Sequence, residues 1–172
     1  LFAGTDKPIS VEVNPHHTDY EKMVAEAEVL AAMSPNFVIK LPAIEAGYKA
    51  VAVLKEKGIR SNLTLVFSAA QALHAMRMGA YFISPFIGWK EANGEEVQSF
   101  IEEILAMRDN YGFSSEIIVA AVRNGRQIAD AAVMGADIVT AGLAVYKDAF
   151  DHPYTGVGLQ KFQEFWDQTP YK

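Results

Sequence analysis

Short apolar runs alternate along this chain with longer amphipathic segments, and glycine often stands where a long segment gives way to the next short run. Six short runs are rich in β-branched and aromatic residues and predict strands at 9–13, 37–41, 62–67, 81–86, 116–122 and 137–141. Most are apolar on both faces, as strands of a sheet covered by helices are. The alternation therefore predicts parallel strands joined by right-handed helical crossovers.

The longer segments have the apolar periodicity of helices. They predict helices at 20–31, 44–57, 69–78, 95–108 and 126–134, with a polar loop at 87–98. Gly58, Gly79 and Gly135 follow three of these segments, where a left-handed residue ends a helix and turns the chain back. Thr18 and Glu21 have the spacing of a capping box at the first helix.

Two α/β architectures fit this order, an open doubly wound sheet and a (β/α) barrel. No G-x-G-x-x-G motif and no P-loop motif follows a predicted strand, so nothing supports a nucleotide-binding open sheet. A complete eight-unit barrel needs about 200 to 250 residues, whereas this chain of 172 residues shows six strand–helix units. We therefore expect a TIM-type barrel of which six units are visible.

Composition excludes several classes of protein. No apolar run reaches the roughly 18 residues of a membrane span, and the start LFAGTDKP lacks the layout of a signal peptide, so we expect no membrane partner. A net charge of −6 without a basic block argues against nucleic acid as a partner. The chain has no cysteine, which excludes disulfides and thiolate chemistry and fits a cytoplasmic location.

Polar residues fall on one face of the predicted strands, near the carboxyl ends. Side chains alternate faces along a strand, and the active sites of barrels lie at the carboxyl ends of the strands. The set supplies a carboxylate, an amine, an amide, hydroxyls and a guanidinium: Glu12, Lys40, Asn62, Thr64, Ser84 and Arg123. We interpret this set as a candidate active site.

Lys40 lies inside the apolar run 37–41. Burial among apolar walls lowers the pKa of a lysine amine and leaves it neutral near neutral pH. A neutral amine attacks a ketone to form a Schiff base, which allows a nearby carbon–carbon bond to break or form. Glu12 and Thr64 would then hold a water that moves protons.

Each of these residues also has a purely structural interpretation. Lys40 is then a surface lysine with Glu12 as its ion-pair partner, and the three small polar residues Asn62, Thr64 and Ser84 are caps or satisfied polar groups. Arg123 either forms a surface salt bridge or binds an anion before the helix that follows. His16 and His17 are adjacent and suit a solvated loop better than a metal site, and no metal-ligand cluster emerges.

Six stretches taken together resemble the transaldolase family, including its small fructose-6-phosphate-aldolase-like branch. They are SVEVNP, NFVIKLPA, SNLTLVFSAAQA, YFISPFIGW, VAAVRN and GADIVTAG, in this order, and they extend over nearly the whole chain. The resemblance implies an (α/β)8 barrel enzyme that needs no metal or organic cofactor. It also implies transfer of a dihydroxyacetone unit between sugar-phosphate substrates through a lysine Schiff base.

The resemblance assigns a role to each residue of the candidate site. Lys40 is implied as the Schiff-base lysine, with Glu12 and Thr64 holding the catalytic water. Asn62 and Ser84 are implied to line the pocket of the donor sugar.

Two further motifs extend the implied site. Arg123, followed by Asn124, is implied to bind the substrate phosphate. Phe86 and Glu12 stand where aldolase-like members tend to have tyrosine and glutamine, and both choices favour transaldolase.

The sequence departs from the family at two places. Trp89, followed by Lys90, stands where the family usually has a second phosphate-binding arginine. Losing that guanidinium removes about 1.5–3 kcal/mol of binding, so either the substrate is less phosphorylated or Lys90 compensates. The family's first two strands, which bring an aspartate proton shuttle, have no counterpart before Leu1. We therefore expect residues 1–172 to be one barrel domain without its first two βα units, and its strand edges would invite association.

Alternatives to a transaldolase stay open. One is an aldolase of the same mechanism that does not require transfer, a second is a non-catalytic relative that binds sugar phosphates, and a third is a metal-dependent barrel aldolase or isomerase. The resemblance also suggests a homo-oligomer. A C-terminal helix at 157–168, with Phe162, Phe165 and Trp166, would contact another copy or fold back over its own barrel.

Overall fold

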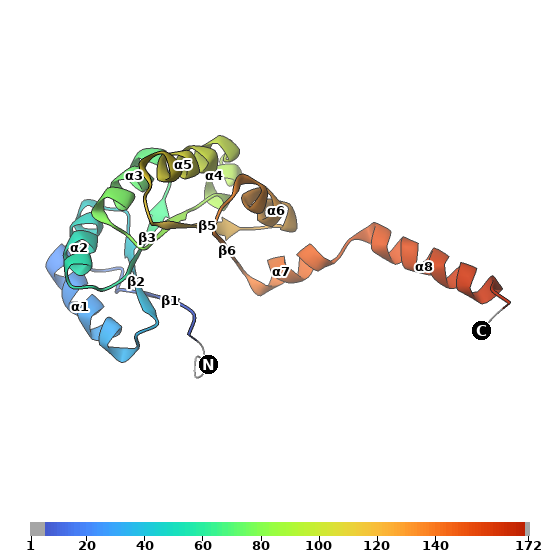
Figure 1. The fold of residues 1–172 in the computed structure, drawn as a ribbon, viewed down its shortest axis with the longest axis horizontal. Coiled ribbons are helices and arrows are strands. Elements are labelled where there is room, and N and C mark those ends of the chain that lie inside the picture. Colours follow the sequence, from blue (N-terminus) through green and yellow to red (C-terminus); the bar gives the residue numbers. More distant parts are fainter. Residues whose placement is uncertain (1–5, 171–172) are drawn as a thin grey trace.

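Six parallel strands form one curved sheet whose spatial order follows the chain (Figure 1). This computed structural model describes residues 6–170. The strands are β1 (Ile9–Glu12), β2 (Phe37–Pro42), β3 (Ser61–Val66), β4 (Phe82–Pro85), β5 (Glu116–Val122) and β6 (Ile138–Ala141). Every neighbouring pair is parallel, with β1 and β6 at the two edges. The predicted TIM-type architecture is confirmed as a half-barrel of six strands.

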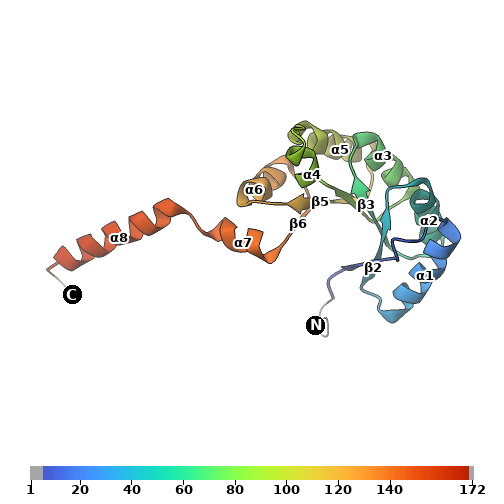
Figure 2. The ribbon, with the colours of Figure 1, turned by 180° about the vertical axis from the view of Figure 1, so that it is seen from behind.

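Helices cover the convex side of this sheet and leave its concave side open (Figures 1 and 2). They are α1 (Tyr20–Met33), α2 (Glu45–Glu56), α3 (Ala69–Met78), α4 (Gly88–Ala92), α5 (Gln98–Tyr111) and α6 (Gly125–Met134). Two more, α7 (Leu143–Phe150) and α8 (Pro153–Gln168), follow the last strand. Within the described residues, no helix combines the length and the apolar character that a membrane crossing requires.

The observed boundaries correct three predictions. The first helix is capped by Asp19 rather than Thr18, because the Asp19 carboxylate accepts a hydrogen bond from the Lys22 amide, and this bond also lowers the pKa of the Asp19 carboxyl group. The predicted loop at 87–98 contains the short helix α4. The C-terminal helix begins at Pro153, earlier than predicted, since proline suits the first turn of a helix.

Glycine ends the helices as predicted. Gly79 and Gly135 are left-handed C-caps with φ of 85° and 90°, and Gly58, which follows the C-cap Lys57 of α2, has a φ of 72°. Each turns the chain back toward the next strand, which keeps the helices on one side of the sheet.

Two apolar clusters hold the sheet. The larger one lies between the sheet and the helices, and its largest side chains have no exposed area: Met23, Ile39, Leu41, Leu54, Leu63, Ile83, Ile101, Ile104 and Ile117. Full burial of such a side chain contributes about 1.5–3 kcal/mol. The smaller cluster consists of Val38, Phe82 and Ile118 on the concave face, and Phe82 and Ile118 line the hollow there.

The two C-terminal helices differ from the others because none of their residues is buried. Figures 1 and 2 show α8 extending away from the half-barrel. Its exposed apolar side chains are Val157, Leu159, Phe162, Phe165 and Trp166.

Gly47 permits a close contact between α2 and the end of β2, where a Cβ atom would lie 1.9 Å from the Pro42 carbonyl oxygen. Alanine normally favours a helix over glycine by about 0.5–1 kcal/mol. At this position we expect Gly47→Ala to lower the free energy of unfolding by about 1–3 kcal/mol, because α2 must move away from β2. Urea denaturation measures the change.

Gly156→Ala on α8 is the matched control, since a Cβ atom there meets nothing within 4 Å. It should leave stability unchanged or raise it slightly. The same response to both substitutions would contradict the importance of the contact at Gly47.

Candidate active site

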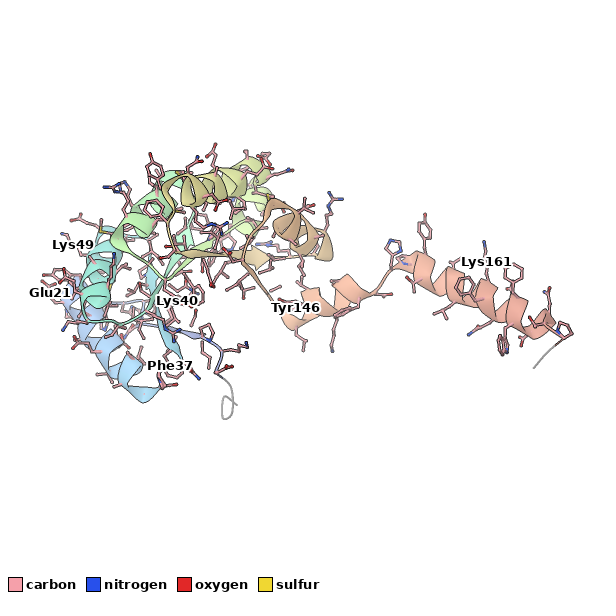
Figure 3. All side chains as sticks on the ribbon, in the orientation of Figure 1. Glu21, Phe37, Lys40, Lys49, Tyr146 and Lys161 are labelled. Atoms are coloured by element: carbon pink, nitrogen blue, oxygen red, sulfur yellow. The ribbon has the colours of Figure 1, made fainter. Side chains whose placement is uncertain are left out.

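A cavity of about 720 Å³ opens on the concave face of the sheet. Five of the predicted site residues line it: Glu12, Lys40, Asn62, Ser84 and Phe86. Figure 3 shows Lys40 on the sheet, inside the arc of helices whose outer side carries Glu21 and Lys49. Thr64, Arg123 and Asn124 lie outside the set of lining residues. The strand alternation read from the sequence thus brings most of the candidate set to one cavity.

Lys40 and Glu12 are direct neighbours on adjacent strands. The register of β1 and β2 places the two residues opposite each other, and Lys40 Nζ donates a hydrogen bond to Glu12 Oε2 at 3.2 Å. The Lys40 side chain is 26% exposed and that of Glu12 is 48% exposed. The amine therefore has a carboxylate within proton-transfer distance and access from the cavity.

The apolar flanks of Lys40 do not surround its amine, contrary to the interpretation of run 37–41. Ile39 and Leu41 have no exposed area and belong to the cluster beneath the helices, on the other face of the sheet. On the amine's own face, the apolar neighbour along the strand is Val38, which packs with Phe82 and Ile118. The pattern identified the strand and the orientation of the lysine, but the apolar walls it suggested lie behind the sheet.

A chain of hydrogen bonds fixes Asn62 beside the lysine. Asn62 pairs with Lys40 in the register of β2 and β3. Its Nδ2 atom donates to Ser10 Oγ at 3.0 Å, and its Oδ1 atom accepts from Ser84 Oγ at 2.8 Å. Asn62 and Ser84 are each only 2% exposed. This network orients the amide and the hydroxyl before any ligand binds.

Thr64 carries a buried hydroxyl group next to this network. It lies two residues beyond Asn62 on β3, pairs with Pro42 in the register, and is only 1% exposed. Among residues 6–170, no group forms a hydrogen bond with Thr64 Oγ1. A buried hydroxyl without a partner is costly, so it calls for a specific explanation.

An aromatic cluster borders the cavity beside Phe86. The rings of Phe67 and Trp89 are stacked with centroids 5.7 Å apart, and Phe86 meets both rings edge-on at 5.8 and 5.9 Å. Trp89 is 52% exposed. The residue at the position of the expected second arginine therefore provides an aromatic surface.

Lys90 does not take the place of that arginine. Its ammonium group is paired with Glu95 and lies 5.1 Å from the centroid of the Phe100 ring. These contacts hold Lys90 against α5, on the convex side of the sheet.

Arg123 and Asn124 follow the carboxyl end of β5 and are exposed. Asn124 has the structural role that its sequence position allows, because its Oδ1 atom caps α6 by accepting from the Gln127 amide at 3.0 Å. The Arg123 side chain passes close to Gly88, where an added Cβ atom would lie 2.8 Å from Arg123 Nε. A guanidinium group therefore stands on the same edge of the sheet as Phe86 and Trp89.

Ser10, Phe82 and Thr140 are among the lining residues that the candidate set read from the sequence omitted. Ser10 and Thr140 share the inward face of their strands with Glu12 and Ile138, so the alternation contains the signal for both. Phe82 is apolar and so was not part of that polar set, although it also lines the cavity.

The arrangement combines an amine, a carboxylate, an oriented amide and three hydroxyls within one hollow, with a guanidinium at its edge. This set can form and hydrolyse an imine, because the nucleophile and a proton-transfer group are in contact. Within the described residues, no group of three or more histidine, aspartate or glutamate side chains is placed to hold a metal ion.

Comparison with known proteins gives a consistent result. Residues 1–169 match the family Transaldolase/Fructose-6-phosphate aldolase. The chain is 50% identical over 169 residues to 6-deoxy-6-sulfo-D-fructose transaldolases of Priestia aryabhattai and Priestia megaterium, covering 98% of this chain and 75% of each relative. It is 46% identical to a probable transaldolase of Sulfurihydrogenibium sp., covering 97% of this chain and 76% of that protein.

Among solved structures, FabK from Thermotoga maritima has a similar fold, with a TM-score of 0.55. The sequence identity is 20%, and the match covers 78% of this chain and 41% of the FabK chain. This likeness supports the barrel architecture alone.

The half-barrel, the cavity with Lys40 beside Glu12, and the match over nearly the whole chain agree. The chain belongs to the transaldolase/fructose-6-phosphate aldolase family, and it is an enzyme of the transaldolase type.

Proposed function

We propose that this enzyme transfers a dihydroxyacetone unit between sugar phosphates through a Schiff base on Lys40. The observation that carries the proposal is the contact of 3.2 Å between Lys40 Nζ and Glu12 Oε2, inside a cavity open to a ligand. The same pair would exist in a purely structural ion pair. The oriented amide of Asn62 and the unpartnered hydroxyl of Thr64 nearby favour the catalytic interpretation.

The chemistry begins when the neutral Lys40 amine adds to the C2 carbonyl of a ketose. Loss of water from the carbinolamine gives a protonated imine. Glu12, which has returned its proton to the departing water, accepts the proton of the C4 hydroxyl through the water that it holds with Thr64. The C3–C4 bond then breaks, and its electron pair moves into the imine to form an enamine. An aldehyde leaves. The enamine attacks the acceptor aldehyde, and water releases the new ketose from Lys40.

The surrounding residues have distinct roles in this scheme. Glu12 takes a proton from the Lys40 ammonium and, with Thr64, holds the water that enters and leaves with the imine. Asn62 and Ser84 donate or accept hydrogen bonds at the hydroxyl groups of the donor sugar.

The far end of the ketose lies toward the edge of the cavity in this proposal. Phe86 borders the carbon chain, and Arg123 binds the anionic group at C6, with Asn124 keeping the adjacent helix terminus in place. A fructose-6-phosphate-type aldolase would use the same residues and differ only in releasing the enamine by protonation instead of transfer.

A ketose with a sulfonate at C6 is the second candidate donor. The relatives that are 50% identical are named 6-deoxy-6-sulfo-D-fructose transaldolases. Lys90 is engaged with Glu95, and Trp89 supplies no charge, so this scheme assigns the anionic group to Arg123, whose side chain passes close to Gly88. One guanidinium suits a singly charged sulfonate better than a doubly charged phosphate.

The homo-oligomer stays a prediction, and α8 supplies its support. Leu159, Phe162 and Trp166 recur at the spacing of one helix face and are exposed. Contact with another copy would bury this face. Sedimentation velocity should show the full-length protein as an oligomer and the variant Phe162→Ser, Trp166→Ser as a smaller species. An unchanged size would favour a helix folded back over its own barrel.

The cytoplasmic location expected from the cysteine-free sequence also stays a prediction.

Reduction with borohydride tests the Schiff base directly. In the presence of dihydroxyacetone, fructose 6-phosphate or 6-deoxy-6-sulfofructose, we expect a covalent adduct on Lys40, which peptide mass spectrometry locates. Lys40→Arg keeps a positive charge beside Glu12 but cannot form the adduct. If the full-length wild-type protein is not labelled, or is labelled on a different lysine, the proposal is wrong. Phosphate-dependent thermal stabilisation without turnover would then favour a non-catalytic sugar-phosphate-binding protein.

Thr64→Val separates the catalytic and structural interpretations of the buried hydroxyl. Valine has nearly the same shape and leaves no unpaired polar atom, so the free energy of unfolding should stay constant or rise by about 1 kcal/mol. The transfer rate should fall by about 10²-fold, because the catalytic water loses a partner. Thr155→Val on the exposed helix α8 is the control. An unchanged rate in Thr64→Val would leave Thr64 a structural residue.

A further inference from the structure

The same shift of strand register and the same turn occur twice among the described residues, at the carboxyl ends of β3 and β5. The register of β3 shifts between Leu63 and Val66, and that of β5 shifts between Val119 and Val122. Within each shift one residue, Leu65 or Ala121, has a φ of 59°. Such values are uncommon outside glycine. A bulge re-aims the side chains that follow it, so each strand end is turned in the same way.

A glutamine closes each of these turns. Gln71 Oε1 accepts from the Phe67 amide at 2.8 Å, and Gln127 Oε1 accepts from the Arg123 amide at 2.6 Å. Both glutamines stand three residues after the N-cap of their helix, and their own amides are bound by the cap residues Ser68 and Asn124. The two turns therefore place Phe67 and Arg123 at equivalent positions.

The two turns differ in the residue that they hold and in the second contact of the glutamine. Phe67 belongs to the aromatic cluster, whereas Arg123 carries the positively charged guanidinium group at the edge of the cavity. The Gln71 side-chain amide donates to the Ala43 carbonyl at 3.4 Å, and that of Gln127 donates to Glu91 in α4. Gln127 is only 5% exposed, so a lost hydrogen bond would not be replaced freely by water.

Arg123 is held from the side of α4 as well. A Cβ atom at Gly88, the first residue of α4, would lie 2.1 Å from the Ala121 carbonyl oxygen and 2.8 Å from Arg123 Nε. The Gln127–Glu91 contact ties this same helix to the turn that carries Arg123. The backbone of Arg123 and one side of its guanidinium are thus fixed by two elements.

We infer that Gln127 is a positioning residue, which sets the direction of Arg123 toward the anionic group of the substrate. The inference rests on the proposed function for the identity of the ligand. Arginine has a long side chain with many rotamers, so affinity for the anion depends on how firmly its backbone is anchored. Gln127 touches no substrate in this arrangement and acts through the Arg123 amide and α4.

Gln127→Leu tests this role in a Lys40→Arg background, where binding is measured without chemistry. The full-length protein is titrated calorimetrically with fructose 6-phosphate and with 6-deoxy-6-sulfofructose. We expect the Kd of the ketose that binds more tightly to rise about tenfold, the factor that 1.4 kcal/mol represents. In the protein with Lys40 intact, KM for that ketose should rise while kcat changes little.

Gln71→Leu is the matched control, because it removes the equivalent side-chain hydrogen bond, here to the Phe67 amide, from the other copy of the turn. It should lower thermal stability to a similar degree and leave the Kd unchanged. The double variant Gln127→Glu, Glu91→Gln exchanges the donor and the acceptor of the contact between the two residues, so it should have the Kd of the parent protein. Gln127→Glu alone brings two carboxylates together, so its Kd should stay raised.

An unchanged Kd in Gln127→Leu, or an equal rise in Gln71→Leu, would overturn the positioning role. Labelling by dihydroxyacetone separates this result from the fate of the proposed function, because that ligand carries no anion for Arg123 to bind. Gln127→Leu should keep the wild-type labelling rate. A loss of labelling in that variant would show damage to the site around Lys40 and would overturn the specific link to Arg123.

Discussion

The parallel register of β1, β2 and β3 is the constraint on which the rest of the site depends. It sets Glu12 opposite Lys40 and Lys40 opposite Asn62, so one level of the half-barrel carries a carboxylate, an amine and an amide side by side. A slip of one residue in β2 would turn Lys40 into the cluster beneath the helices and bring Ile39 to the cavity. The apolar packing of the convex face opposes such a slip, which means that the hydrophobic core also fixes the chemistry.

The charges at the edge of the cavity follow from packing in a similar way. Lys90 is one residue from Trp89, yet its ammonium is bound to Glu95 and covered by Phe100, away from the cavity. The Trp89 indole ring instead packs against Phe67 and against Phe86, which lines the cavity. The edge of the cavity therefore carries one guanidinium group and an aromatic surface.

Sequence alone predicted the strands, the polar face and the orientation of Lys40, because these depend on alternation within single strands. It did not predict contacts between residues far apart in the chain, such as the hydrogen bond from Ser84 to Asn62 or the ring stacking at Trp89. The environment of Lys40 was misjudged for a different reason: Ile39 and Leu41 are its neighbours in sequence, but the alternation of the strand puts them on the opposite face. The paired turns ending in Gln71 and Gln127 could be predicted from the sequence, because each glutamine follows a strand, a polar cap residue and two intervening residues. The register shifts before them could not, because they depend on backbone angles such as the positive φ of Leu65 and Ala121.

The most direct test is a crystal structure of the full-length protein with a ketose bound. We predict continuous electron density from Lys40 Nζ to C2 of fructose 6-phosphate or 6-deoxy-6-sulfofructose, with the anionic group at Arg123 and a water between Glu12 and Thr64. A ketose that occupies the cavity while Lys40 Nζ stays bound to Glu12, with no covalent link, would contradict the role of Lys40 as the nucleophile.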